Sequence, residues 1–361
     1  MLSVGRIDSE PATPTLRESL ITVIEPRESE IRKLAFELFE LRGRKHGWDL
    51  ADWICARRAA RFYKNYERVF FNLLFAPKRT NVAVSVPQTC RFCKRTRPEV
   101  TFSSEAHAVP MFLGNRAIFS KSECDHCNND FSKYLEDHFA RFLHGTRTSG
   151  KMRGRKRIPT YTTNRNLSRF FVNGDRIEIH QYPYDSIAML DPETNTARIE
   201  LQSQPYTPLA VYKCLTKIAL SIMPDAELPH FLDSISWVVA QDHNVRAHDF
   251  RNALGYLAFT PGPLPEHYGW VELFRRRQSS LRVPYMVLAL VSMNLTFQIY
   301  VPLCSQDLHQ AGQQMTMPAF PAGINCGYEF GETEFVNMPI SSPDPATHTN
   351  TVIWTPVPTF G

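Results

Sequence analysis

Apolar residues near the start of the chain recur three or four positions apart, which predicts an amphipathic helix that begins near Ser29 and ends before Gly43. The repeating positions are Ile31, Leu34, Ala35, Leu38 and Leu41. Asp49 is placed to cap a second helix, so we expect a helical hairpin within a helical region at residues 28–80. Residues 1–27 show no sustained period and are expected to form a flexible lead-in.

The pattern changes to strand-like alternation later in the chain. Residues 81–89 alternate in part between apolar and polar side chains, which predicts a strand. Residues 176–180 and 197–201 alternate like half-buried strands, while 285–292 and 295–301 have the pattern of a β-hairpin. One helical stripe lies between these strands, at Val211, Leu215, Ile218 and Ala219.

The order of these elements predicts an α+β chain in several parts. The N-terminal part is the helical hairpin, and a central module follows it. The expected parts after residue 80 are a module at 81–145, a basic linker at 146–157, an α+β domain at 158–340 and an irregular tail at 341–361.

Composition agrees with a globular protein of two or three domains, because the chain has 361 residues of which 43% are hydrophobic and 21% charged. The first residues lack the apolar core of a signal peptide, and no apolar run approaches the length of a membrane span, so we expect a cytoplasmic protein without a membrane partner. The net charge is only +5, so a nucleic-acid surface would have to be a local patch.

Four of the eight cysteines stand in two C-x-x-C pairs. Cys90 and Cys93 form the first pair, and Cys124 and Cys127 form the second. In a reducing compartment such pairs are read first as metal ligands, and two of them supply the four sulfur ligands that a structural zinc ion prefers. The spacing therefore predicts a zinc site. The remaining cysteines have no such spacing and are interpreted as ordinary buried thiols.

The segment between the cysteine pairs adds a second signal. Its sequence EAHAVPMFLGN, at 105–115, places a histidine three residues before a proline and then a glycine turn with an asparagine. In the order C-x-x-C, A-H-x-x-P, G-N, C-x-x-C-N, residues 90–145 resemble the HNH endonucleases. The resemblance implies a β-hairpin and a helix around one catalytic metal ion, braced by zinc.

The resemblance also implies roles for individual residues. His107 matches the histidine that acts as general base on water, and a bound Mg²⁺ or Mn²⁺ would polarise the scissile phosphate of DNA. Asn115 matches the asparagine that holds this base, and Asn128 matches a metal ligand at the start of the helix. The alternatives are a histidine satisfied in a small core, a plain Gly-Asn turn at Asn115, and helix capping at Asn128.

One position departs from the family pattern. Many members carry an acidic residue or a histidine directly before the catalytic histidine, and this chain has Ala106 there. Glu105 or His126 could replace that metal ligand, or water could fill the position. The third alternative is an inactive site.

A basic stretch follows the cysteine region. It contains no acidic residue and is expected either to bind the phosphates of DNA or to form a solvated linker. Its positive residues, with one from the preceding helix, are Arg141, Arg147, Lys151, Arg153, Arg155, Lys156 and Arg157.

The helical hairpin has a resemblance of its own. Residues 28–58 resemble a short bacterial domain of unknown function with an RG turn and a GHDLEDW-like second helix. The matching residues are Arg42, Gly43, Gly47, Asp49, Leu50, Asp52 and Trp53, while Trp48 and Ala51 differ. We interpret the segment as a packed helical hairpin, and the alternative is a docking or nucleic-acid-contacting pair.

Three functional hypotheses follow. The first is a metal-dependent DNA endonuclease, and the second is a zinc-stapled nucleic-acid-binding protein without activity. In the third, residues 158–340 bind a regulatory ligand or protein partner that controls the nuclease, as in an effector of bacterial defence. The sequence does not indicate an oligomeric state.

Overall fold

The computed structural model describes residues 23–85, 87–154, 157–174, 176–243, 255–265, 267–310, 315–324 and 328–354. The helices are α1 (Glu28–Leu41), α2 (Asp49–Asn65), α3 (Asp125–Phe131), α4 (Asp137–Phe142), α5 (His144–Ser149), α6 (Pro208–Ile222) and α7 (Leu232–Val239). A π-helical turn, η2 (Ser132–Glu136), joins α3 to α4, and the short 3-10 turns within the described residues are η1 (Met111–Leu113), η3 (Leu228–Phe231) and η5 (Ser305–Gln310).

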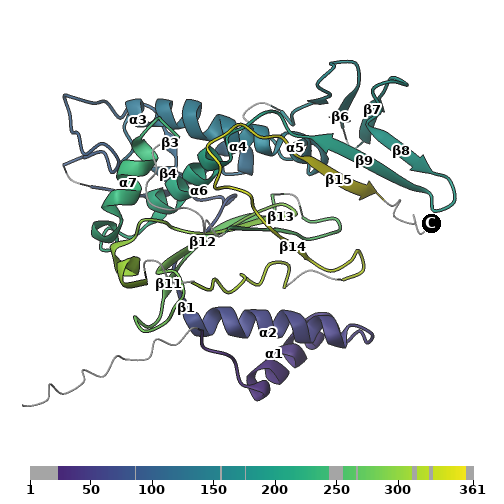
Figure 1. Cartoon of the computed structure of the whole chain (residues 1–361), viewed down its shortest axis with the longest axis horizontal. Helices are drawn as coiled ribbons and strands as arrows, with labels where there is room; N and C mark the ends of the chain where they lie inside the picture. Colours follow the sequence, from purple (N-terminus) through teal and green to yellow (C-terminus); the bar gives the residue numbers. More distant parts are fainter. Residues whose placement is uncertain are drawn as a thin grey trace, which may run out of the picture.

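Four sheets accompany these helices (Figure 1). The largest has the order β1-β11-β12-β13-β10-β14, formed by Tyr66–Leu73, Gly269–Arg276, Met286–Ser292, Leu295–Tyr300, Gly255–Phe259 and Glu334–Asn337. The second joins β2 (Thr80–Val82), β4 (Ile118–Ser120) and β3 (Ala106–His107). The others are β5 (Tyr161–Thr162), β6 (Arg169–Asn173) and β7 (Arg176–His180), and β15 (Thr349–Trp354), β9 (Thr196–Gln202) and β8 (Ala188–Asp191).

The six-stranded sheet is covered on both faces. In Figure 1 the helices α1 and α2 lie on one side of it, and α3, α4, α6 and α7 lie on the other. Strand β12 is therefore buried on both faces. Leu288 and Leu290 belong to the core cluster on the α6 side, and Val287 and Ala289 belong to the cluster on the α2 side. A strand buried on both faces reads as a continuous apolar run, which is why 286–292 is apolar throughout.

The central module and the C-terminal part share one core. Phe139 of α4 packs edge-on against Phe297 of β13, with ring centroids 5.2 Å apart. The hydroxyl group of Ser292 in β12 donates a hydrogen bond to the carbonyl oxygen of Leu113 at 2.8 Å. The cysteine region is therefore seated on the six-stranded sheet.

The α+β class is confirmed, with a helix pair at the N-terminus, a central β/α region and a sheet-rich C-terminal part. The predicted hairpin is formed by β12 and β13, and the strands predicted at 176–180 and 197–201 are β7 and β9. Strand β2 at Thr80–Val82 takes up only the beginning of the strand predicted at 81–89.

Three expectations were wrong. The helical region contains strand β1, which pairs antiparallel with the distant β11, so local pattern alone did not reveal it. The tail contains strand β15, which pairs with β9 and is therefore not irregular over Thr349–Trp354. Asp49 is the first residue of α2 and follows the capping position at Trp48, so it stabilises the helix through its charge in the first turn.

Candidate active site

The thiols of the two C-x-x-C pairs lie together. The four Sγ atoms are all within 4.8 Å of one another. Cys90 and Cys127 are 3.8 Å apart, as are Cys93 and Cys124. Four sulfur atoms bound at about 2.3 Å to one tetrahedral zinc ion are roughly 3.8 Å apart, whereas a disulfide needs about 2.05 Å. The cluster therefore fits a structural zinc ion.

Local backbone geometry holds each cysteine pair. In the first, the backbone nitrogen of Lys94 donates to the carbonyl oxygen of Cys90 at 2.9 Å, and Lys94 adopts the left-handed conformation with φ of 61°. In the second, Cys124 caps helix α3, and its sulfur accepts a hydrogen bond from the backbone nitrogen of Cys127 at 3.5 Å. Both turns direct their sulfur atoms to one point.

His107 lies on a β-hairpin that precedes helix α3. Strand β3 pairs antiparallel with β4, which places His107 opposite Phe119, with ring centroids 4.7 Å apart. The chain then passes through the second cysteine pair into α3. Two strands followed by a helix are the arrangement that the resemblance implied, and the half-buried His107 lies on its first strand.

The surroundings of His107 favour the neutral imidazole. Burial lowers the pKa of His107 to about 4, and the nearby positive charges of Lys217, Arg116 and Arg79 act in the same direction against the opposing effect of Glu105. A neutral imidazole at pH 7 can accept a proton, which is the requirement for a general base.

Asn115 is fully buried at the end of the loop between β3 and β4. Its amide nitrogen donates to the carbonyl oxygens of Val109 and Ile118 at 2.7 and 2.9 Å, and its amide oxygen accepts from the backbone nitrogens of Ala117 and Ile118 at 3.0 and 2.9 Å. The amide nitrogen also lies 3.4 Å from Nδ1 of His107. The two amide hydrogens already have closer acceptors, so Asn115 fixes the loop and lies beside the ring of His107.

Residues 90–144 match a family described as HNH endonuclease, and residues 26–61 match a family described as a protein of unknown function (DUF2934). Residues 90–144 form an HNH endonuclease family domain. No curated protein and no solved structure matched the chain. The domain contains both cysteine pairs, the hairpin with His107 and helices α3 and α4.

A hard cation would find few protein ligands beside His107 in this HNH domain. Across the described residues, the four thiols are the only set of three or more His, Cys, Asp or Glu side chains placed to hold a metal ion. Glu105 is exposed and pairs with Arg79 at 2.7 Å. It stands two residues before His107, directly ahead of strand β3, and its negative charge acts on the imidazole. A Mg²⁺ ion that keeps most of its water would fit such a site.

The other proposed ligands have different neighbours. His126 is exposed on α3 and lies 3.5 Å from Asp130, four residues further along the helix. Asn128 is half-buried on α3, and its amide nitrogen lies 3.4 Å from the hydroxyl oxygen of Ser104. Of the two replacements considered for the missing acidic residue at Ala106, Glu105 is therefore better placed than His126.

The basic stretch separates into different environments. Arg147 lies on α5, and its half-buried guanidinium stacks on the ring of Phe112 at 5.1 Å. Lys151, Arg153 and Arg157 are exposed. Arg155 and Lys156 lie outside the described residues.

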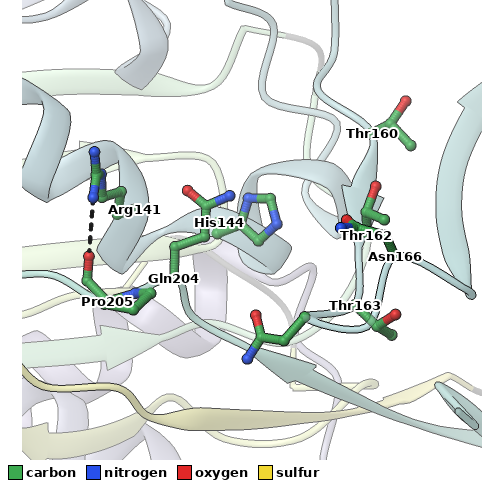
Figure 2. A pocket seen from close by; sticks show the side chains of 9 residues that line it. Arg141, His144, Thr160, Thr162, Thr163, Asn166, Gln204 and Pro205 are labelled. Carbon is green, nitrogen blue, oxygen red and sulfur yellow. Dashed lines mark hydrogen bonds between the residues drawn. The ribbon is translucent and has the colours of Figure 1, made fainter.

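Arg141 has a separate setting, because it lines an open polar pocket of about 570 Å³ next to α5 (Figure 2). Its guanidinium pairs with Asp137 at 2.7 Å and donates to the carbonyl oxygen of Pro205 at 3.5 Å. His144, Thr162 and Asn166 line the same pocket. Arg141 is thus held by contacts within the protein, although its side chain is exposed.

Three positive residues near His107 were missed in the sequence. Arg116 directly follows the Gly-Asn pair and donates to the carbonyl oxygens of Met111 and Gly154 at 2.9 and 2.8 Å, which fastens the basic stretch to the hairpin loop. Arg79 lies over the ring of Phe119, at 4.7 Å. Lys217 comes from α6, and the only sequence signal for it was a lysine, like Lys213, in a mostly apolar helix.

Proposed function

We propose that the chain is a metal-dependent endonuclease that hydrolyses phosphodiester bonds of DNA, with His107 as the general base. The observation that carries this proposal is the position of His107 on the hairpin of an HNH endonuclease family domain, beside Asn115 and in the same domain as the four-thiol cluster. The zinc ion would act as a structural brace only.

His107 would take a proton from the attacking water. Its pKa of about 4 keeps the imidazole neutral at pH 7, so the base is ready before substrate arrives. Asn115 would keep the loop behind the ring in place through its four backbone hydrogen bonds. A Mg²⁺ or Mn²⁺ ion, held by Glu105 and Asn128 with water, would supply Lewis-acid stabilisation of the phosphate when bound.

Positive side chains would guide the DNA backbone to this base. Arg79 and Arg116 lie close enough to His107 to lower its pKa, so they would also attract a phosphate placed beside the imidazole. Lys151, Arg153 and Arg157 extend the positive charge along the exposed stretch after α5. Such contacts position a nucleic acid without reading its sequence.

A plasmid-nicking assay tests the proposal. We expect wild-type protein to nick supercoiled DNA with Mg²⁺ or Mn²⁺, and His107→Ala to lower the rate about a hundred- to ten-thousand-fold. His180→Ala is a matched control, because His180 is exposed on β7 and outside the HNH domain. Equal nicking by His107→Ala and wild type would contradict the assignment of the base.

A second candidate is a zinc-stapled nucleic-acid-binding protein that does not cleave. Two observations favour it: Ala106 stands where the family has a metal ligand, and the described residues contain no second metal-ligand cluster. Salt-dependent binding of DNA by the wild type, with no nicking in either divalent ion, would select this function.

Control of the nuclease by residues 158–340 stays a prediction, as does a role in bacterial defence. The shared core supports control, because α6 and β12 of that part contact the HNH domain directly. Its test is nicking by the full chain before and after addition of a cell extract from bacteria under phage infection. A rate that does not change would count against control by such a ligand.

A further inference from the structure

Lys217 is a buried lysine in the middle of helix α6, outside the segment that matches the HNH family. Its side chain has no exposed surface. The ammonium nitrogen donates a hydrogen bond to the backbone carbonyl oxygen of His107 at 3.1 Å. A residue of the C-terminal part thus reaches the strand that carries the proposed base.

Two carboxylates balance this ammonium group. Glu123 lies 3.0 Å away and is itself fully buried, and Glu136 lies 3.8 Å away. Glu123 directly precedes Cys124 of the second cysteine pair, while Glu136 ends the π-helical turn between α3 and α4. One ammonium group therefore connects the strand of His107, the second cysteine pair and the final helix of the domain.

The energetic cost of this arrangement is high. Removing an ammonium group from water is strongly unfavourable unless hydrogen bonds and opposite charges compensate for it. An apolar residue would fill the same position in α6 without that cost, because α6 is buried over its whole length. A buried ion cluster does not by itself indicate a gain in stability. We therefore explain this cluster by the groups that it holds in position.

Lys213 shows what a buried lysine does elsewhere in the same helix. It lies one turn before Lys217 and is equally buried. Its ammonium group donates to the carbonyl oxygens of Ala240 and Asp242, just beyond α7, at 2.8 and 3.1 Å. These contacts hold two C-terminal segments together and do not reach the HNH domain.

We propose that Lys217 is a positioning residue for His107, so that the C-terminal part completes the HNH site. The ammonium group, anchored by Glu123 and Glu136, fixes the backbone of β3 and thereby the direction of the imidazole. The expected effect on cleavage rests on the proposed function. The position of the His107 ring does not, because it can be measured without cleavage.

The test compares Lys217→Met/Glu123→Gln with Lys213→Met in the full chain. The double variant removes the charges of Lys217 and Glu123, so the fully buried Glu123 is not left as an unpaired carboxylate, and only Glu136, whose side chain is 22% exposed, loses its ammonium partner. We expect it to keep its zinc and its affinity for a DNA duplex within about twofold, while kcat for nicking falls roughly ten- to a hundredfold, the cost of misplacing a catalytic group. Lys213→Met should keep kcat within about twofold.

The second readout is the NMR signal of the His107 ring in protein labelled at histidine Cε1, assigned by its loss in His107→Ala. We expect this signal to move in the Lys217 double variant and to stay in place in Lys213→Met. An unmoved signal, or a kcat equal to that of Lys213→Met, would overturn the proposal. If the wild type does not nick DNA, the proposed function fails while the NMR signal still decides the positioning role.

Glu136→Gln provides a milder variant if the double variant does not fold. It keeps the ammonium group and removes one of its two anchors. We expect a smaller displacement of the His107 signal and a loss of a few-fold in kcat. A signal and a rate equal to those of the wild type would contradict the anchoring role.

Discussion

Arg91 and Asp225 form an ion pair that joins the first cysteine pair to the end of helix α6. The guanidinium of Arg91 also donates to the carbonyl oxygens of Leu220 and Met223 at 2.7 and 2.8 Å, where helix α6 has run out of backbone donors. A residue between Cys90 and Cys93 thus caps the helix that supplies Lys217. The four-thiol cluster and the surroundings of His107 are therefore parts of one structure.

Replacing Arg91 with methionine should destabilise the whole chain. Its side chain is only 3% exposed, and its loss leaves several helix-end carbonyl groups without a partner. We expect the free energy of unfolding to fall by about 3 kcal/mol. Urea unfolding measures it, with Arg97→Met as the control because Arg97 is exposed. Equal values for the two variants would show that the capping contacts contribute little.

Loss of one zinc ligand should remove the metal and loosen the HNH domain. Cys124→Ser leaves three sulfur atoms, and structural zinc contributes folding free energy directly. We expect less than one-tenth of a zinc ion per chain after dialysis and a lower unfolding temperature. Cys55→Ser, which changes a thiol outside the cluster, should retain one zinc ion per chain. Elemental analysis distinguishes the two variants, and retention of zinc by Cys124→Ser would exclude the four-sulfur site.

Asn115→Ala should reduce both stability and activity, in contrast to His107→Ala. The amide makes four backbone hydrogen bonds in a fully buried position, so its removal leaves donors and acceptors unpaired. We expect a loss of about 2–4 kcal/mol. Thermal unfolding together with nicking rates measures both effects. A stable, inactive Asn115→Ala would instead indicate a direct chemical role for the amide.

The exposed basic residues should determine how DNA affinity responds to salt. Each phosphate contact that is removed is expected to lower the slope of log K against log salt by about 0.9. For Arg153→Gln/Arg157→Gln we expect a decrease of about 2, measured by fluorescence anisotropy from 50 to 200 mM KCl. Arg57→Gln is the control, since Arg57 is exposed on α2 on the other side of the six-stranded sheet. Unchanged slopes in the double variant would leave the stretch as a solvated linker.

The value of kcat/KM should not change near neutral pH through protonation of a histidine. The folded pKa of His107 is lowered to about 4, so the imidazole is already neutral at pH 6 and protonation stops the reaction only near pH 4. We expect kcat/KM to be level from pH 6 to pH 8. A rate that falls to half near the usual histidine pKa of about 6.5 would show that the base is not held in this environment.

The sequence was sufficient to predict the parts of the site whose residues lie close together along the chain. The cysteine pairs, His107 and Asn115 stand in a short ordered motif, and the structure brings them together within one hairpin and helix. Lys217 and Arg91 could not be predicted as partners of this site, because their contacts join segments more than a hundred residues apart. The same reason applies to β1, whose aromatic residues pair with a strand near residue 270.

The pairing of β1 with β11 has a consequence for synthesis of the protein. A ribosome delivers Tyr66–Leu73 long before Gly269–Arg276, so this strand has no partner while most of the chain is still being made. The cysteine pairs emerge together, but α6 emerges later and the sheet beneath them closes last. A nascent chain would thus complete its four-thiol cluster well before the helix that supplies Lys217 and the sheet that supports both are in place.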